Sequence, residues 1–157
     1  MDVEEWYRGL RQIQDRGEIG NAYNRCGSIM SELNDVLDNF YEYILEKYED
    51  CMPLWAEAFI QIYNWQFQTM HECAEAYYEN FYGNSEYQTI IKVANYLGKN
   101  GYNEIAEPYA CAAVDCERYQ YPADKAYLLP DDWIDNHEET IWNFYVDILE
   151  NHKEDLI

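Results

Sequence analysis

Carboxylates recur at helical spacing between Ser31 and Asp50, and this repeat constrains the fold more than any other feature of the sequence. Apolar residues fall on one face of the same stretch, at steps of three and four: Leu33, Val36 or Leu37, Phe40, Ile44 and Tyr48. Acidic residues fall on another face at the same steps: Glu32, Asp35, Asp38, Glu42, Glu46 and Glu49. The pattern predicts one amphipathic helix with a row of like charges that is about 26 Å long at 1.5 Å per residue.

This acidic row lowers the stability of its helix. Five neighbouring like-charge pairs at about 0.2–0.5 kcal/mol each cost roughly 1–2.5 kcal/mol before salt screening. Lys47 is the only base in the stretch, and it lies beside the row. The spacing of about one charge per 5 Å approaches the charge spacing of a DNA strand, about one per 3.4 Å of axis. Such a row suits a basic groove, although a solvated outer face is the ordinary explanation.

The overall charge limits the partners of the chain. Its 157 residues include 31 acidic and 10 basic ones, which gives a net charge of −21. Nucleic acids and anionic membranes would be repelled, whereas basic proteins would be attracted. Halophilic adaptation is a rival source of such charge. A hydrophobic content of 48% argues against disorder, so we expect a single domain over residues 1–157.

Location is predicted from what the sequence lacks. The first ten residues show no basic-then-apolar signal pattern, and no run of 18 apolar residues occurs. The five cysteines are scattered and odd in number, which favours reduced thiols that pack in the interior. We therefore expect a cytoplasmic protein that does not span a membrane.

Helical periodicity continues along the rest of the chain. It predicts helices over Val3–Arg16, Asn21–Glu49 (as one piece or two), Leu54–Tyr82, Tyr87–Leu97, Asn103–Tyr119 and from Asp131 onward. No strand pattern competes with them. The fold class expected is therefore all-α, an antiparallel bundle of about five to six helices.

The last predicted helix carries a second acidic row at steps of mostly four. Its members are Asp131, Asp135, Glu139, Asp147, Glu150 and Glu154, with Asn143 in the middle. Two acidic rows in a chain with so few bases favour the hypothesis that a negatively charged surface has a function. The sequence does not show whether the two rows are adjacent. Several tyrosines lie near acids or at helix ends and are candidate partner contacts: Tyr41, Tyr43, Tyr78, Tyr82 and Tyr119.

One short stretch resembles a tetratricopeptide repeat. Leu97-Gly98, Ala110 and Pro122 have similar spacings to that repeat over about 35 residues. The repeat's Trp is missing, Gly101 stands where a Tyr is expected, and no second copy exists. We interpret the stretch as a generic helical hairpin.

Catalytic and metal-binding patterns are missing from the sequence. The three histidines, His71, His137 and His152, form no His-Glu-x-x-His pattern, and the nearest match to a di-iron motif, Gln68-x-x-His71, lacks the carboxylate. Cys111 and Cys116 are five apart, which does not suit a shared metal on one helix. No glycine-rich phosphate loop is present either. We therefore predict no enzyme activity, no metal and no cofactor.

In composition and helical charge rows, the chain resembles the small acidic inhibitors that phages use against restriction enzymes and CRISPR effectors. The resemblance is to a class and rests on Glu32 to Glu49 and Asp131 to Glu154, with no family motif. It implies a nucleic-acid mimic that occludes the groove of a basic DNA- or RNA-binding protein. The alternative is an acidic helical adaptor without mimicry, and the third hypothesis is a helical enzyme. The aromatic content allows a homodimer.

Overall fold

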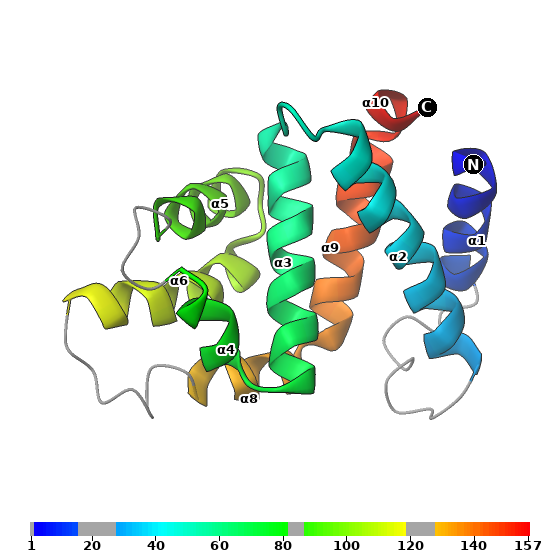
Figure 1. The fold of residues 1–157 in the computed structure, drawn as a ribbon. Coiled ribbons are helices and arrows are strands. Elements are labelled where there is room, and N and C mark those ends of the chain that lie inside the picture. Colours follow the sequence, from blue (N-terminus) through cyan, green and yellow to red (C-terminus); the bar gives the residue numbers. More distant parts are fainter. Residues whose placement is uncertain (1, 16–27, 82–86, 119–127) are drawn as a thin grey trace. The chain divides into compact units, whose positions relative to one another are not determined.

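The computed structural model describes residues 2–15, 28–81, 87–118 and 128–157, and every regular element among them is a helix. The all-α prediction is thereby confirmed. The helices are α1 (Val3–Asp15), α2 (Ser28–Lys47), α3 (Leu54–His71), α4 (Ala74–Glu79), α5 (Tyr87–Lys99), α6 (Asn103–Arg118), α8 (Leu128–Asn136), α9 (Glu138–Asn151) and α10 (Lys153–Leu156) (Figure 1). Their contacts divide into two compact units, residues 1–56 with 138–157 and residues 57–137.

Nine helices occur in the described residues, more than the five to six predicted, because two long predicted helices are interrupted. The first interruption separates α3 from α4 at Cys73, whose backbone is extended. The other interrupted helix is the last one, predicted from Asp131 onward. It is divided at His137 and again at His152 into α8, α9 and α10.

A histidine side chain accounts for the break between α8 and α9. In a continuous helix the backbone N–H of His137 would bond to the carbonyl of Trp133. Here the ring Nδ1 of His137 lies 2.8 Å from that carbonyl oxygen, and the backbone N–H turns to Ile134 O at 3.3 Å. Local side-chain bonds of this kind compete with the helix ladder and end it.

The helical hairpin of the second unit forms where the sequence predicts it. α5 ends at a left-handed Gly101, with φ of 88°, and the N–H of Tyr102 bonds to Leu97 O at 2.8 Å. This is a helix C-capping motif with a left-handed glycine, in which the N–H of a residue beyond the helix bonds to one of the last helical carbonyls. The side-chain amide of Asn100 takes another terminal carbonyl, Tyr96 O, at 2.8 Å. α6 then packs along α5.

In the first unit, α1 and α2 meet through aromatic side chains. The ring of Tyr7 stands edge-to-face on Phe40 at 4.9 Å, and that of Trp6 does so at 5.5 Å. Val36 approaches Gly9, where an added Cβ would lie 3.4 Å from a methyl group, so α1 passes close to α2 here. Tyr7, Leu10 and Ile13 are the buried residues of α1. Trp6 is only half-buried.

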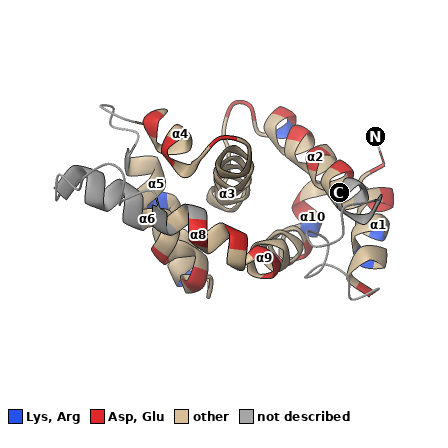
Figure 2. Ribbon diagram, turned by 90° about the horizontal axis from the view of Figure 1, so that it is seen from below, with Lys and Arg blue, Asp and Glu red and all other residues tan. Residues whose placement is uncertain are grey.

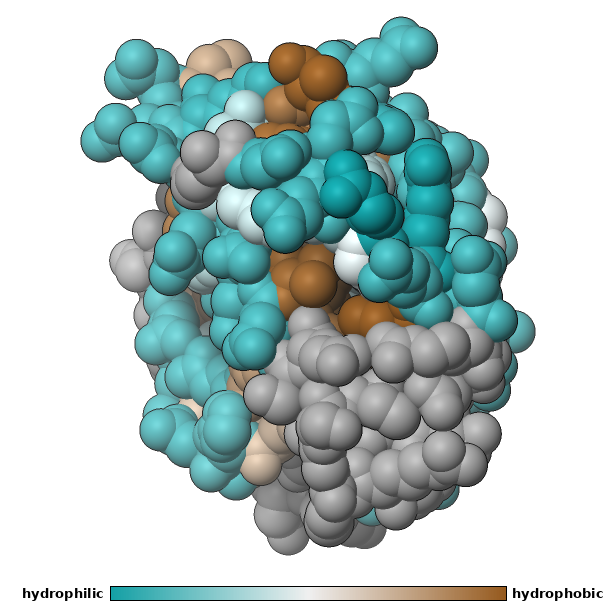
Figure 3. Space-filling model, turned by 90° about the vertical axis from the view of Figure 1, so that its right-hand side faces the viewer, coloured by the Kyte–Doolittle hydropathy of each residue, from teal (hydrophilic) through white to brown (hydrophobic). Residues whose placement is uncertain are grey.

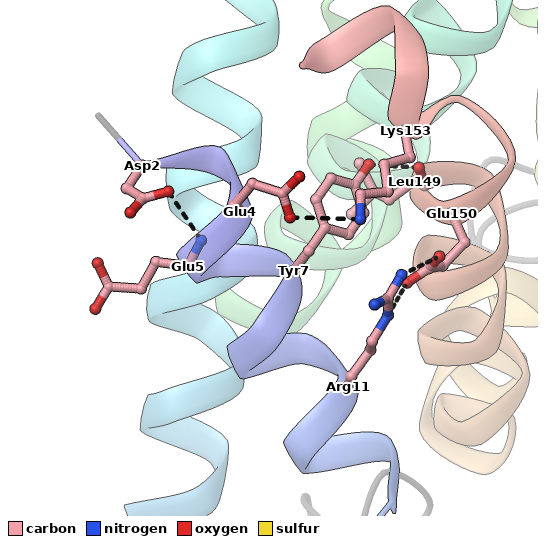
Figure 4. A network of polar contacts seen from close by, with 8 residues as sticks. All are labelled: Asp2, Glu4, Glu5, Tyr7, Arg11, Leu149, Glu150 and Lys153. Carbon is pink, nitrogen blue, oxygen red and sulfur yellow. Dashed lines mark hydrogen bonds and ion pairs between the residues drawn. The ribbon is translucent and has the colours of Figure 1, made fainter.

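Polar contacts hold α1 to the C-terminal helices (Figure 4). The hydroxyl of buried Tyr7 donates to Leu149 O on α9. Arg11 forms a bidentate pair with Glu150, in which Nε lies 3.0 Å from Oε1 and Nη2 lies 3.2 Å from Oε2. Lys153 lies 3.5 Å from a carboxylate oxygen of Glu4 and 5.1 Å from the centre of the Tyr7 ring. These four contacts fix α1 against α9 and α10.

A network of buried tyrosines forms the interior of the second unit. The hydroxyls of Tyr77 and Tyr109 are 2.8 Å apart, and Tyr77 donates to Gln61 Oε1 at 2.7 Å. Tyr78 donates to the carbonyl of Tyr109 at 2.7 Å, and Trp65 stands edge-to-face on the Tyr109 ring. Burial raises the pKa of both Tyr77 and Tyr109 far above the ordinary value for tyrosine. Burial raises the pKa of Tyr7 in the first unit as well.

These raised pKa values predict a loss of stability in alkali. Above pH 10 the unfolded chain loses tyrosine protons that the folded chain keeps, so the free energy of unfolding falls as the pH rises. Urea unfolding measured between pH 8 and pH 11 should show the fall. Tyr77→Phe should cost about 1–3 kcal/mol at pH 8, because Gln61 and Tyr109 lose a partner, and should flatten the alkaline decline. An equal decline in wild type and variant would contradict the assignment.

Candidate functional site

The outward face of α2 carries the first acidic row. Asp35, Asp38, Glu42 and Glu46 are exposed on the helix, and Glu49 is exposed just beyond its end. Acidic segments recur along the α2 ribbon in Figure 2. The opposite face is fully buried through Leu33, Leu37, Phe40 and Ile44. Glu32 lies in α2, but its side chain is outside the described part of the structure. The apolar face therefore turns five of the six predicted carboxylates toward solvent.

Bases of the described chain do not neutralise this row. Among the residues that the structure describes, no ion pair involves Asp35, Asp38, Glu42, Glu46 or Glu49. Lys47 lies 5.5 Å from the centre of the Tyr43 ring, which sits off the row. Partial burial raises the pKa of Asp38, and the carboxylates of Asp35 and Glu42 raise it further. The repulsion expected from the sequence therefore acts at the centre of the row.

The second predicted row does not lie on a single helix. Asp135 is exposed on α8 in the second unit, whereas Glu139 and Asp147 are exposed on α9 in the first. Glu154 is exposed on the short α10. The helix breaks at His137 and His152 cause this division, so the uniform spacing in sequence does not place these acids on one helix. The side chain of Asp131 is outside the described part.

One member of the second row already has a partner. Glu150 is held by Arg11 of α1, and its side chain is only 32% exposed. The guanidinium binds the carboxylate in a bidentate geometry, which is the stronger form of an Arg–carboxylate pair. Glu150 therefore joins α9 to α1, which could not be predicted from local patterns because the two residues are 139 positions apart.

The C-terminal helix adds acidic groups near the end of the first row. Tyr43 donates to Leu156 O at 3.0 Å, and Tyr48 donates to Asp155 O at 3.4 Å. These bonds hold α10, with exposed Glu154 and Asp155, against the C-terminal half of α2. The charge of Asp155 adds to burial in raising the pKa of Tyr48. The acidic surface of the first unit, defined here as the exposed acids of α2 with Glu49, Glu154 and Asp155, thus draws on both helices.

The candidate tyrosines have varied positions. Tyr43 is half-buried and used as a tether, and Tyr41 is half-buried on α2. Tyr78 is fully buried, so its proposed role as a surface contact is wrong. It lies on the apolar side of α4, a helix that begins only after the break at Cys73. Tyr82 and Tyr119 lie outside the described residues.

Apolar areas and metal-binding groups are the other surface features to consider among the described residues. Hydrophilic residues cover most of the described face in Figure 3, and apolar residues show in small separate areas. Among the side chains that the structure describes, the large exposed apolar ones are Leu45, Leu54, Ile91 and Ile157. Within the described ranges no group of three or more His, Cys, Asp or Glu could hold a metal ion, and no helix has the length and apolar content to cross a membrane.

Comparisons with protein-family models, with curated proteins and with solved structures gave no match to this chain.

Neutralising the centre of the acidic row should stabilise the protein. Asp38→Asn removes one i,i+3 and one i,i+4 repulsion, which predicts a gain of about 0.4–1 kcal/mol in low salt. Because the pKa of Asp38 is raised in the folded state, wild-type stability at this site is greater below that pKa and falls as the pH rises through it. The gain should therefore be present at pH 7 and vanish in acid.

Urea unfolding in low and high salt measures this effect, since salt should reduce the gain. Asn39→Asp is the matched control, because it adds a charge at the neighbouring exposed position. It should lower stability. A loss of stability in Asp38→Asn would mean that the carboxylate has a favourable partner.

Proposed function

We propose that this protein is a non-enzymatic inhibitor that presents the acidic surface of its first unit to the basic groove of a DNA- or RNA-binding protein. Phage anti-restriction and anti-CRISPR proteins are the class we have in mind, acting in the cytoplasm. The observation that carries the proposal is the row on α2, which stays exposed and free of ion pairs with described bases despite its internal repulsion. Lys and Arg of a partner would relieve that repulsion.

The mechanism would be competition without chemistry. Carboxylates on a rigid helix would take the places of phosphates and keep nucleic acid out of the groove. Because α2 is anchored by a fully buried apolar face, its charges are held in place before binding, which reduces the ordering cost. We further propose that the helices of the whole chain form one antiparallel bundle.

A charge-matched pair of variants tests the proposed site. Glu42→Gln, Glu46→Gln and Glu49→Gln together change the net charge from −21 to −18, by three lost charges. Exposed Glu79, Glu104 and Glu107 of the second unit give a control triple with the same change. Calorimetry against a captured basic partner should show at least a tenfold loss for the first triple and little for the second. Equal losses would indicate a general charge effect.

Salt dependence separates mimicry from an adaptor function. For a mimic, log affinity should fall against log salt with a slope of several units, as for proteins that bind phosphates. Leu45 favours the adaptor, because it is an apolar side chain 39% exposed on the same helix. Leu45→Gln should then abolish binding, and the salt profile should be nearly flat. A pull-down from host lysate in low and high salt, followed by both variants, decides between them.

A further inference from the structure

We propose that His152 is a pH-sensitive joint, which holds α10 against the end of α2 more tightly when its ring is protonated. The residue stands between α9 and α10 with φ of −115° and ψ of 21°, outside the helical conformation. Its contacts all lie within the first unit. The proposal does not depend on the proposed function, because the joint is internal to this unit.

Two contacts of the ring favour its charged form. The imidazole stacks on the indole of Trp55 with centroids 4.4 Å apart and planes 5° from parallel. Its Nδ1 lies 3.0 Å from Asp155 Oδ2. An imidazolium would gain a cation–π attraction from the indole face and a charge-assisted bond to the carboxylate. The neutral ring keeps only the stack and an ordinary hydrogen bond.

The surroundings connect this ring to α10 and α2. Trp55 is buried, and Tyr48, the first residue after α2, stands edge-to-face on it at 5.9 Å. The hydroxyl of Tyr48 bonds to the carbonyl of Asp155, the same residue whose carboxylate faces His152. A stronger contact between His152 and Asp155 would therefore also stabilise the position of the Asp155 carbonyl, which accepts the Tyr48 hydrogen bond.

The other charged groups near the joint do not oppose this effect. α10 contributes Lys153 beside His152, but its ammonium is paired with Glu4 of α1 at 3.5 Å. The turn after α2 contributes the neutral phenol of Tyr48, and α3 contributes the uncharged Trp55. Asp155 is thus the charge that acts directly on the ring. An unperturbed histidine side chain changes its charge between about pH 5 and pH 8.

Amide hydrogen exchange tests the joint directly. The N–H of Asp155 bonds to His152 O, and that of Ile157 bonds to Lys153 O, so their exchange reports the opening of α10. After correction for the intrinsic pH dependence of exchange, their protection should rise about three- to tenfold between pH 7.5 and pH 5.5. His152→Gln should remove this rise. A wild type without the rise, or a variant that keeps it, would overturn the proposal.

A second stack in the chain supplies the control. His137 stacks on Trp133 at 4.4 Å and 3°, but its Nδ1 faces a backbone carbonyl instead of a carboxylate, and it lies in the second unit. His137→Gln should leave the rise at Asp155 and Ile157 unchanged, and a loss there would contradict a local joint. Should His152→Gln unfold, Asp155→Asn keeps the stack and should reduce the rise. A full rise in that variant would exclude the carboxylate and overturn the proposal.

Discussion

The first unit depends on the opposition between the two faces of α2. Leu33, Leu37, Phe40 and Ile44 are fully buried, and each such side chain contributes about 1.5–3 kcal/mol when it leaves water. Repulsion along the outward face costs roughly 1–2.5 kcal/mol, which the buried face exceeds several-fold. The buried face therefore keeps α2 folded in spite of the like charges along its outward face.

Tyrosine does much of the joining that lysine and arginine do in proteins with more bases. The hydroxyls of Tyr7, Tyr43 and Tyr48 each donate to a backbone carbonyl on the C-terminal helices. Tyr78 makes the same kind of bond in the second unit. A phenol is a neutral donor, so it joins two elements without neutralising a carboxylate. This explains how a chain with 17 tyrosines and 10 bases can pack its helices and remain so negative.

Periodicity in the sequence was sufficient to predict the helical class and the buried face of α2, because both depend on residues three and four positions apart. It failed where a single side chain ends a helix. The ring of His137 takes the Trp133 carbonyl, and no pattern of polarity shows that competition. It failed again at Glu150, whose partner Arg11 comes from the other end of the chain. The even spacing of the second acidic row predicted one helix, and this was wrong because the chain is divided at His137 and His152 into α8, α9 and α10.

The contrast between Glu150 and the acids of α2 bears on what the acidic surface is for. Arg11 shows that this chain can pair a carboxylate with a base across 139 positions when the fold requires it. Lys153 pairs with Glu4 in the same unit, so two bases near the C-terminal helices serve the packing of α1. Lys47 follows the row on its own helix, yet its ammonium lies near the Tyr43 ring. Arg11 and Lys153 thus hold α1 against the C-terminal helices, whereas no ion pair among the described residues involves the five exposed carboxylates of the first row.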